Sequence, residues 1–512
     1  MSSARTTRAS APARPEDERL PVGKSFGYGL QHVLTMYGGI IAPPIIIGNA
    51  AGVTPDQIAL LIASCLFVGG LATILQTVGI PFFGSQLPLV QGTSFASVAT
   101  LTAIVTGGGG LPAAFGAVLI ASLIGLLITP FFSMVVHLFP PVVNGVVITA
   151  IGLSLLPVAG NWIMGNNAKA PDYGSVANLG MAGLTLLIIM LLSKVGSAAI
   201  SRLSILLGLI IGTVIAAVTG MADFSKVGTG AVVAFPQPFA FGLPTVPVAG
   251  TISMVIVVLV IMTETTADIL AVGEIAGSRV DARRVGNGLR ADMLASTVAP
   301  VFNGFTQSAF AQNVGLVAIT GVKSRFVVTA GGVILVVLGL VPVVGRIVAA
   351  IPYPVLGGAG VVLFGTVAAS GIRTLAKVEY RNNLNLVIVA VSLGFGMLPI
   401  VRPTIYDKFP DWFATIFDSG ISSAAIMAIL LNILFNVITA GNTPDASVFA
   451  AGPVRMVRDD ELEALEEGDY FQGGKLMDKD GNVVEVVTPA VFDEAVKTGA
   501  IQRVPRNGNT AH

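Results

Sequence analysis

The sequence predicts an all-α polytopic membrane protein with fourteen transmembrane segments. Only 11% of its 512 residues are charged, and the mean hydropathy is +0.84. An average soluble domain has about 25% charged residues. Residues 25–440 are almost continuously apolar and are broken only by short polar or glycine-rich loops. A soluble chain could not cover its surface with so few charges, whereas a chain surrounded by lipid has no need to.

The apolar region has room for fourteen helices if each span takes roughly 20 residues and the loops are short. The formal net charge is zero, so the composition gives no reason to expect a nucleic-acid partner. We expect the spans near residues 26–48, 57–80, 86–105, 111–133, 139–158, 178–194, 202–220, 250–272, 286–304, 309–322, 326–345, 354–371, 383–400 and 420–440.

The two ends of the chain are polar and are predicted to lie on the same side of the membrane. Residues 1–24 are basic and lack the apolar core of a signal peptide. The loops predicted on their side hold eleven Lys and Arg residues, against five on the other side. Because Lys and Arg favour the cytoplasm, we expect a plasma (inner) membrane protein with both termini cytoplasmic. The tail, residues 453–512, is acidic, and its run 459–467 is expected to be a solvated helix or loop.

A short motif occurs twice, which predicts an internal repeat. Phe139-Pro140-Pro141-Val142-Val143-Asn144-Gly145 is echoed by Pro352-Tyr353-Pro354-Val355-Leu356-Gly357-Gly358, about half of the membrane region later. Seven is an odd number, so a second set of seven spans must insert upside down, as in many secondary transporters. We therefore divide the membrane region into a first repeat, 25–235, and a second, inverted repeat, 236–452.

Two spans look interrupted at corresponding places in the two halves. Residues 84–95 and 303–315 are rich in Gln, Ser, Thr, Gly and Phe, which suit neither a lipid-facing helix nor a simple core helix. Paired interruptions of this kind are typical of a binding site near the membrane midplane, where half-helices and extended backbone line a cavity.

Glu264 is the most informative ionisable residue, because it follows a long apolar run in the eighth span. A charge at the centre of a span costs at least about 2.5–3.5 kcal/mol on insertion scales. Asp268 is four residues later and therefore on the same helical face. Two acids on one buried face will not both stay ionised without partners. The pair predicts a proton-binding site or a carboxylate that binds a polar substrate; a structural pair satisfied by the polar segments is the alternative.

The other reactive residues give weaker signals. His32, beside Gln31, is either a structural histidine or part of the site. Asp292, near Arg290, is interpreted as a salt bridge or helix cap at the inner end of its span. One cysteine, Cys65, excludes a disulfide framework, and three histidines indicate no metal site. There is no complete phosphate-binding Gly-x-x-x-x-Gly-Lys-Ser/Thr loop, so neither ATP nor any other cofactor is expected, and an enzyme is not predicted.

The segment Gln312-Asn313-Val314-Gly315-Leu316-Val317-Ala318-Ile319-Thr320-Gly321 resembles the signature of the nucleobase–ascorbate transporter family, also called nucleobase:cation symporter-2. Gln31-His32, Gly92-Thr93-Ser94-Phe95-Ala96, and Glu264 with Asp268 match further family motifs in the same order. The resemblance covers residues 25–440. It implies fourteen spans in two inverted seven-span repeats, with short strands in spans 3 and 10. It also implies a core domain (spans 1–4 and 8–11), a gate domain (spans 5–7 and 12–14) and a possible homodimer.

The resemblance also implies roles for individual residues. Glu264 would hydrogen-bond ring N–H groups of a nucleobase and Gln312 would contact its other edge. Phe95 and Ala311 would contribute backbone amides, with Ser94 and Asn313 beside them. Glu264 and Asp268 would couple protons, with sodium the less favoured ion. The supporting residues implied are His32, Gln31, Gly315 and Thr320.

The resemblance favours a purine substrate. Family members that carry xanthine or uric acid have Gln at the position of Gln312, whereas uracil carriers have Glu. Thr265-Thr266-Ala267 departs from the family, which often has Gly in this stretch, and leaves the identity of the base open. We expect proton-coupled import of xanthine or uric acid. A uracil or other nucleobase permease of the same fold is the alternative, and a passive channel or a membrane enzyme also remains possible at this stage.

Overall fold

The computed structural model describes residues 14–132, 139–195, 197–225, 227–380 and 384–438, together with short stretches of the tail between residues 456 and 490. The chain forms two compact units. One unit comprises Met1–Val378 and Ile388–Thr439, and the other comprises Glu379–Val387 and Ala440–His512. The acidic run 459–467, for which we expected a solvated helix or loop, lies outside the described residues.

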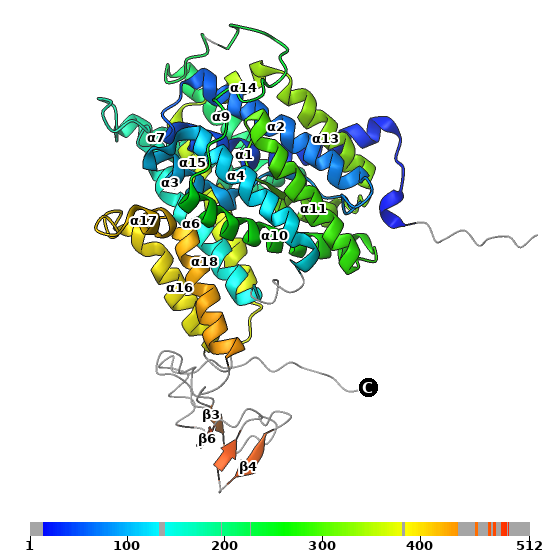
Figure 1. The fold of residues 1–512 in the computed structure, drawn as a ribbon, viewed down its shortest axis with the longest axis vertical. Coiled ribbons are helices and arrows are strands. Elements are labelled where there is room, and N and C mark those ends of the chain that lie inside the picture. Colours follow the sequence, from blue (N-terminus) through cyan, green and yellow to red (C-terminus); the bar gives the residue numbers. More distant parts are fainter. Residues whose placement is uncertain are drawn as a thin grey trace, which may run out of the picture. The chain divides into compact units, whose positions relative to one another are not determined.

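The first unit is built almost entirely from helices (Figure 1). Those before residue 240 are α1 (Val22–Ala50), α2 (Pro55–Val78), α3 (Val98–Ile104), α4 (Gly110–Ile128), α6 (Pro141–Ile163), α7 (Val176–Val195), α8 (Ala198–Arg202) and α9 (Ser204–Val218). Those after it are α10 (Val248–Ala276), α11 (Ala282–Val298), α12 (Ala311–Thr320), α13 (Arg325–Gly339), α14 (Pro342–Ala349), α15 (Tyr353–Leu375), α16 (Leu384–Val401), α17 (Asp411–Phe417) and α18 (Gly420–Asn432). Single turns are η1 (Pro15–Asp17), η2 (Phe95–Ser97), η4 (Thr129–Phe131) and η6 (Ala299–Phe302), and π-helical turns are η3 (Val105–Gly109) and η7 (Ile433–Val437).

Nine helices among the described residues are long and apolar enough to cross a bilayer. A tenth span results if α13 and α14, which meet at 78°, are counted together. The chain is therefore a mostly helical membrane protein, and this part of the prediction is confirmed. The other expected spans correspond to shorter or more polar elements, since α9 and α12 are too short and α11 contains four charged residues. The count of fourteen spans stays a prediction.

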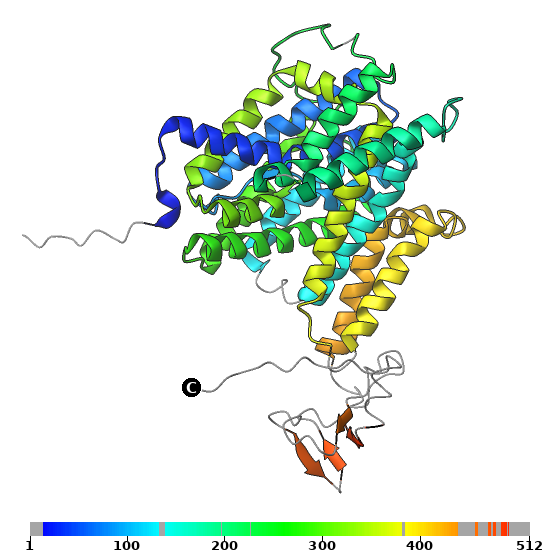
Figure 2. The ribbon, with the colours of Figure 1, turned by 180° about the vertical axis from the view of Figure 1, so that it is seen from behind.

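The helices pack mainly within two sets. In the first set, α2 packs on α13, α1 on both of them, and α4 on α10 and α11. In the second set, α15 packs on α6, α7 and α9, and α18 packs on α6. Figure 2 shows α1, in dark blue, running beside the yellow-green helix α13 of the first set. Contacts between the sets are fewer and involve mainly α10 with α17 and α18, and α1 with α9.

Helices α6 and α15, which begin at the two copies of the repeated motif, are in backbone contact because glycine faces the partner helix. A β-carbon at Gly152 would lie 2.2 Å from the backbone nitrogen of Ala368. One at Gly371 would lie 2.3 Å from the backbone nitrogen of Thr149. Neither neighbour can move without shifting its helix, so glycine is required at both positions.

We expect Gly152→Ala to lower the thermal stability of the protein markedly. The added methyl group overlaps helix α15, and overpacking of this kind costs about 1–3 kcal/mol or more. Gly160→Ala is the matched control, because it lies on the same helix and a β-carbon there has no neighbour within 4 Å. The control should be neutral or slightly stabilising, since Ala is a better helix former than Gly. Equal melting temperatures for the two variants in detergent would contradict the packing argument.

The two segments that look interrupted in the sequence pair with each other. Strand β1 (Gln91–Thr93) runs antiparallel to strand β2 (Gln307–Ala309), with Gly92 opposite Ser308. Hydrogen bonds from Ser94 N to Thr306 O (2.9 Å) and from Phe310 N to Val90 O (3.1 Å) extend the pairing. The expected short strands are thus confirmed. Helix α12 begins two residues after β2, and the turn η2 begins two residues after β1.

The N-terminal turn η1 is fastened to the first unit by two carboxylates. Glu16, whose side chain is fully buried, accepts a hydrogen bond from Ser278 and an ion-paired one from Arg284 Nη2 at 2.5 Å. Asp17 accepts hydrogen bonds from Arg325 Nε at 2.6 Å and from Arg14 Nε at 2.8 Å. We call residues 14–18 the N-terminal strap. Its partners come from the segment after α10, from α11 and from the start of α13.

The strap should make stability depend on pH in the acidic range. Burial raises the pKa of Glu16, but the hydrogen bonds from Ser278 and Arg284 outweigh this and hold it below its usual value of 4.5. A lowered folded-state pKa stabilises the fold above the unfolded pKa, and the contribution is lost as the pH falls through the folded pKa. We expect the melting temperature to fall between about pH 5 and pH 3. The fall should be smaller in Glu16→Gln, whose melting temperature is already lower than that of the wild type at neutral pH. The control is Glu18→Gln, whose exposed side chain lies in the same segment; it should behave as the wild type.

The tail contains a small sheet, which corrects the expectation that the chain is all-α. Its strands are β3 (Met456–Arg458), β4 (Tyr470–Gln472), β5 (Lys475–Met477) and β6 (Val483–Val487), in the order β3-β6-β5-β4. The pair β3–β6 is parallel and the other pairs are antiparallel. The run of valines in β6 explains the strand, because β-branched residues favour extended backbone.

Candidate functional site

Helix α10 carries Glu264 and Asp268 on one face, as the sequence predicts. Both residues are half-buried, whereas the neighbouring residues Met262, Thr263 and Thr265 are buried. The helix packs against α12, strand β2, turn η2 and α3. The helix that carries the two acids therefore packs against the polar segments that are interrupted in the sequence.

The structure provides neither acid with a protein partner. The ion pairs of the N-terminal strap involve neither acid, and within the described residues no donor bonds to the carboxylate of Glu264 or of Asp268. A carboxylate has about four acceptor positions, and leaving them unused in a low-dielectric region is costly. Two unpaired acids on one accessible face can bind a proton or a ligand that donates hydrogen bonds.

The residues after the two strands lie next to α10. Gln312 and Ala311, in the first turn of α12, have exposed side chains, and the Gln312 amide has no side-chain partner in the described part of the chain. The Phe95 ring is half-buried and meets Phe364 of α15 edge to face, with ring centroids 6.1 Å apart. Phe95 thus touches the second set of helices. Ser94 is buried, and its hydroxyl accepts from Ala96 N at 3.3 Å, so it caps η2.

Asn313 and His32 are joined by hydrogen bonds behind this accessible face. Asn313 Nδ2 lies 3.1 Å from His32 Nδ1 and donates to the His32 carbonyl oxygen at 2.9 Å. Both side chains are almost fully buried. This contact connects α12 to α1 across 281 residues of sequence, so both residues hold the site together.

The remaining predicted supporting residues have local roles. The Gln31 carbonyl accepts from Thr35 Oγ1 at 2.8 Å, and Thr320 Oγ1 donates to the Leu316 carbonyl at the same distance. Gly315 is half-buried, and a β-carbon there would meet no atom within 4 Å. Tight packing therefore does not explain this glycine.

Asp292 has a larger role than the sequence indicated. It does not pair with Arg290, which donates to Asn287 instead. Asp292 is almost fully buried and accepts hydrogen bonds from Thr265 Oγ1 at 2.6 Å and from Gln76 Nε2 at 3.2 Å. The end-of-helix salt bridge that we expected is thus wrong.

The Thr265 hydroxyl also connects Asp292 to the strands. It accepts a hydrogen bond of 3.4 Å from Ala309 N of β2. Asp292 therefore fixes the residue next to Glu264 and, through it, strand β2. Thr265 is one of the residues that depart from the family pattern. This departure is the feature of the sequence that could have indicated the hydrogen bonds around Asp292.

Comparison with known proteins decides what kind of protein carries this site. A family model described as a permease family, Xan_ur_permease, matches residues 23–405. The chain belongs to this permease family. It is thereby a member of the nucleobase–ascorbate transporter family, as the motifs predicted.

The permease is similar over most of its length to transporters of oxidised purines. It is 40% identical to the xanthine permease of Bacillus subtilis over 415 residues, which cover 81% of this chain and 94% of the relative. It is 38% identical to the uric acid transporter of Escherichia coli over 434 residues, which cover 84% and 90% of the two chains. It is 34% identical to a xanthine permease of Escherichia coli, covering 82% and 93%.

Solved structures with a similar fold are more distant in sequence. The transmembrane domain of the cyanobacterial bicarbonate transporter BicA matches with a TM-score of 0.55 and 17% identity, covering 80% of the permease and 97% of that chain. The murine anion transporter Slc26a9, in its inward-facing state, matches with a TM-score of 0.57 and 15% identity, covering 85% and 74%. At these identities the likeness concerns the fold alone.

Proposed function

We propose that the permease is a secondary active transporter that imports xanthine, uric acid or both across the plasma membrane. The observation that carries the proposal is the pair of unpaired carboxylates, Glu264 and Asp268, on a helix that packs against α12 and η2. The names of the relatives, which are xanthine and uric acid permeases, support the substrate class.

The available groups match the edges of an oxidised purine. The Glu264 carboxylate accepts hydrogen bonds from ring N–H groups. The exposed Gln312 amide both donates and accepts, which suits an edge where a C=O group stands beside an N–H group. Backbone amides at Phe95 and Ala311 lie at the beginnings of short helices, where the positive dipole end favours carbonyl oxygen. The Phe95 ring offers a surface on which the base can stack.

Proton symport is the proposed driving force, with sodium less favoured. Glu264 and Asp268 are acids on the accessible face, and Asp292 lies behind them without a cationic partner among the described residues. One proton shared by these three acids would lower their total negative charge before the base binds.

The proposed movement is a rocking or elevator motion of the core domain against the gate domain. The two sets of helices, which pack mainly within themselves, support such a division. The proposal includes fourteen spans in two inverted repeats, both termini in the cytoplasm, and a possible homodimer.

Two alternatives deserve a direct comparison. A uracil or other nucleobase permease would use the same site, but its substrate would present a different edge to Gln312. The fold neighbours carry bicarbonate or other anions, but such small anions lack the row of ring N–H groups that two unpaired carboxylates can accept from, which favours a nucleobase.

The test is uptake of labelled xanthine by cells that express the permease, with unlabelled urate, uracil, guanine and hypoxanthine as competitors. We expect urate to compete and uracil not to, and a protonophore to abolish accumulation. Accumulation of uracil, with neither xanthine nor urate transported, would overturn the purine proposal. Equilibration without accumulation would indicate a channel.

A further inference from the structure

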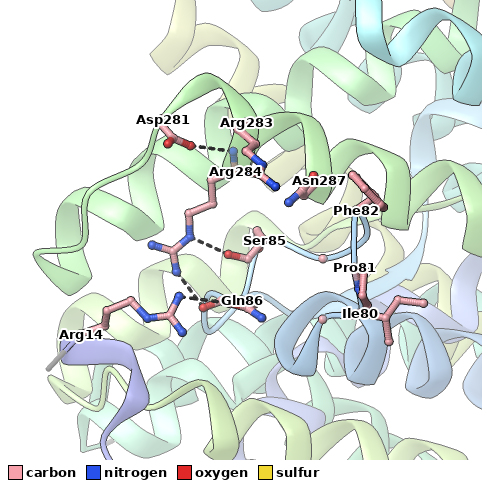
Figure 3. A pocket seen from close by; sticks show the side chains of 12 residues that line it. Arg14, Ile80, Pro81, Phe82, Ser85, Gln86, Asp281, Arg283, Arg284 and Asn287 are labelled. Carbon is pink, nitrogen blue, oxygen red and sulfur yellow. Dashed lines mark hydrogen bonds between the residues drawn. The ribbon is translucent and has the colours of Figure 1, made fainter. Parts of the chain in front are cut away.

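A cavity lies at the end of the first set of helices, beside the N-terminal strap. Figure 3 shows it between the loop that follows α2 and the beginning of α11. Its volume is about 450 Å³. The lining residues are Arg14, Gly79, Ile80, Pro81, Phe82, Gly84, Ser85, Gln86, Asp281, Arg283, Arg284 and Asn287.

One wall of this cavity is basic. Two of its arginines form ion pairs with acids of the strap, Arg14 with Asp17 and Arg284 with Glu16. Asp281, the acid of the lining, accepts a hydrogen bond from Arg284 N at 2.8 Å and so caps α11. Arg283 is exposed, and it has no ion-pair partner among the residues that the structure describes. It is therefore the arginine of this wall whose charge remains available to a ligand.

The opposite wall is an apolar turn with an unusual backbone. Ile80 and Phe83 exchange hydrogen bonds of 2.9 and 3.0 Å, so that Pro81 and Phe82 form the tip. Phe82 has φ +71°, a conformation that L-residues rarely adopt and that favours glycine at this place in a turn. Phe82 is nevertheless 64% exposed, and Ile80 is 54% exposed. A strained aromatic tip directed outward indicates a function rather than packing.

The position of the turn places these apolar side chains at the edge of the bilayer. The turn follows α2 directly, and α2 is one of the long apolar helices. A basic wall next to exposed apolar groups at the end of a span has the chemistry of a phospholipid-binding site, because arginine binds phosphate and the apolar groups contact acyl chains.

We propose that this cavity binds the head group of an anionic phospholipid, with its phosphate on Arg283 and its acyl chains against Ile80 and Phe82. Ser85, whose buried hydroxyl has no hydrogen-bond partner in the described part of the chain, also belongs to the lining. The lipid would bridge the loop after α2 and the beginning of α11. A soluble phosphate would use the arginine but would leave the apolar turn without a role.

The test is lipid-dependent thermal unfolding of the purified full-length protein in detergent. Unfolding can be followed with a thiol-reactive dye, because Cys65 is the sole cysteine and is fully buried. Phosphatidylglycerol should raise the melting temperature saturably, and phosphatidylcholine should have little effect. Arg283→Gln should require about fivefold more phosphatidylglycerol for the same shift, since one basic residue at a membrane surface contributes about that factor.

Two further variants make the result decisive. Arg373→Gln is the matched control, because Arg373 is exposed at the end of α15 and lies outside the cavity. It should respond to phosphatidylglycerol as the wild type does. Phe82→Gly relieves the backbone conformation, so it should fold normally and still lose part of the lipid effect.

Three results would overturn the proposal. The first is an equal response of Arg283→Gln and Arg373→Gln. The second is an equal response to phosphatidylcholine and phosphatidylglycerol. The third is full stabilisation by glycerol 3-phosphate or inorganic phosphate at the same concentration, which would assign the cavity to a soluble anion.

Discussion

Glu264→Gln should abolish accumulation of xanthine while leaving the protein folded in the membrane. An amide has one acceptor oxygen instead of two, carries no charge and does not take up a proton at physiological pH. Each hydrogen bond to a charged group contributes about 1.5–3 kcal/mol, so the loss of two predicts at least about a 100-fold drop in uptake at low substrate concentration. The measurement is initial uptake of labelled xanthine between pH 5 and pH 8.

The same helix provides the control for this variant. Glu274→Gln makes the same chemical change at an exposed position of α10, ten residues further on, and should transport normally. Glu264→Asp keeps the charge and should retain part of the activity. If Glu264→Gln kept normal uptake with a normal pH dependence, the assignment of this residue to the substrate and the proton would be wrong.

Asp292→Asn should lower uptake about 10- to 100-fold, although Asp292 is buried behind the accessible face. Asp292 accepts from both Thr265 and Gln76. An asparagine amide would turn a donor towards one of them, and a buried donor without a partner costs about 1–3 kcal/mol. Successive helical residues point about 100° apart, so Thr265, held by Asp292, sets the direction in which Glu264 points.

A positioning role for Asp292 can be separated from a general structural role. Thr265→Val breaks the same link from the other side and should cause a similar loss, whereas Thr265→Ser keeps the hydroxyl and should restore most of the activity. The double variant should be little worse than either single variant, because both act on one interaction. Asp172→Asn, at an exposed loop acid, is the control. Additive losses, or normal uptake by Thr265→Val, would contradict the role.

Local features of the fold could be predicted from the sequence. The apolar composition predicts the helical membrane unit, and the polar interruptions predict the short strands β1 and β2, because both signals are contained within single segments. Glu264 and Asp268 were recognisable for the same reason, since an acid in an apolar helix stands out by itself.

Features that depend on residues far apart in the sequence could not be predicted in this way. Asp292 and Gln76 are 216 residues apart, and nothing near Asp292 indicates that its partner is not Arg290. The N-terminal strap looked like an ordinary polar tail, since Arg284 is 268 residues away from Glu16. The tail sheet was missed because its strands are very short and lie in a charged segment.

The N-terminal strap has a consequence for the order in which the protein is completed. Glu16 and Asp17 are synthesised before their partners, because Arg284 and Arg325 follow 268 and 308 residues later. At about 5–20 residues per second, the acids wait roughly 15–60 s for their partners. The strap can therefore close only after α10 and α11 have been made and the start of α13 has emerged, so this early segment is fixed in place only late in folding.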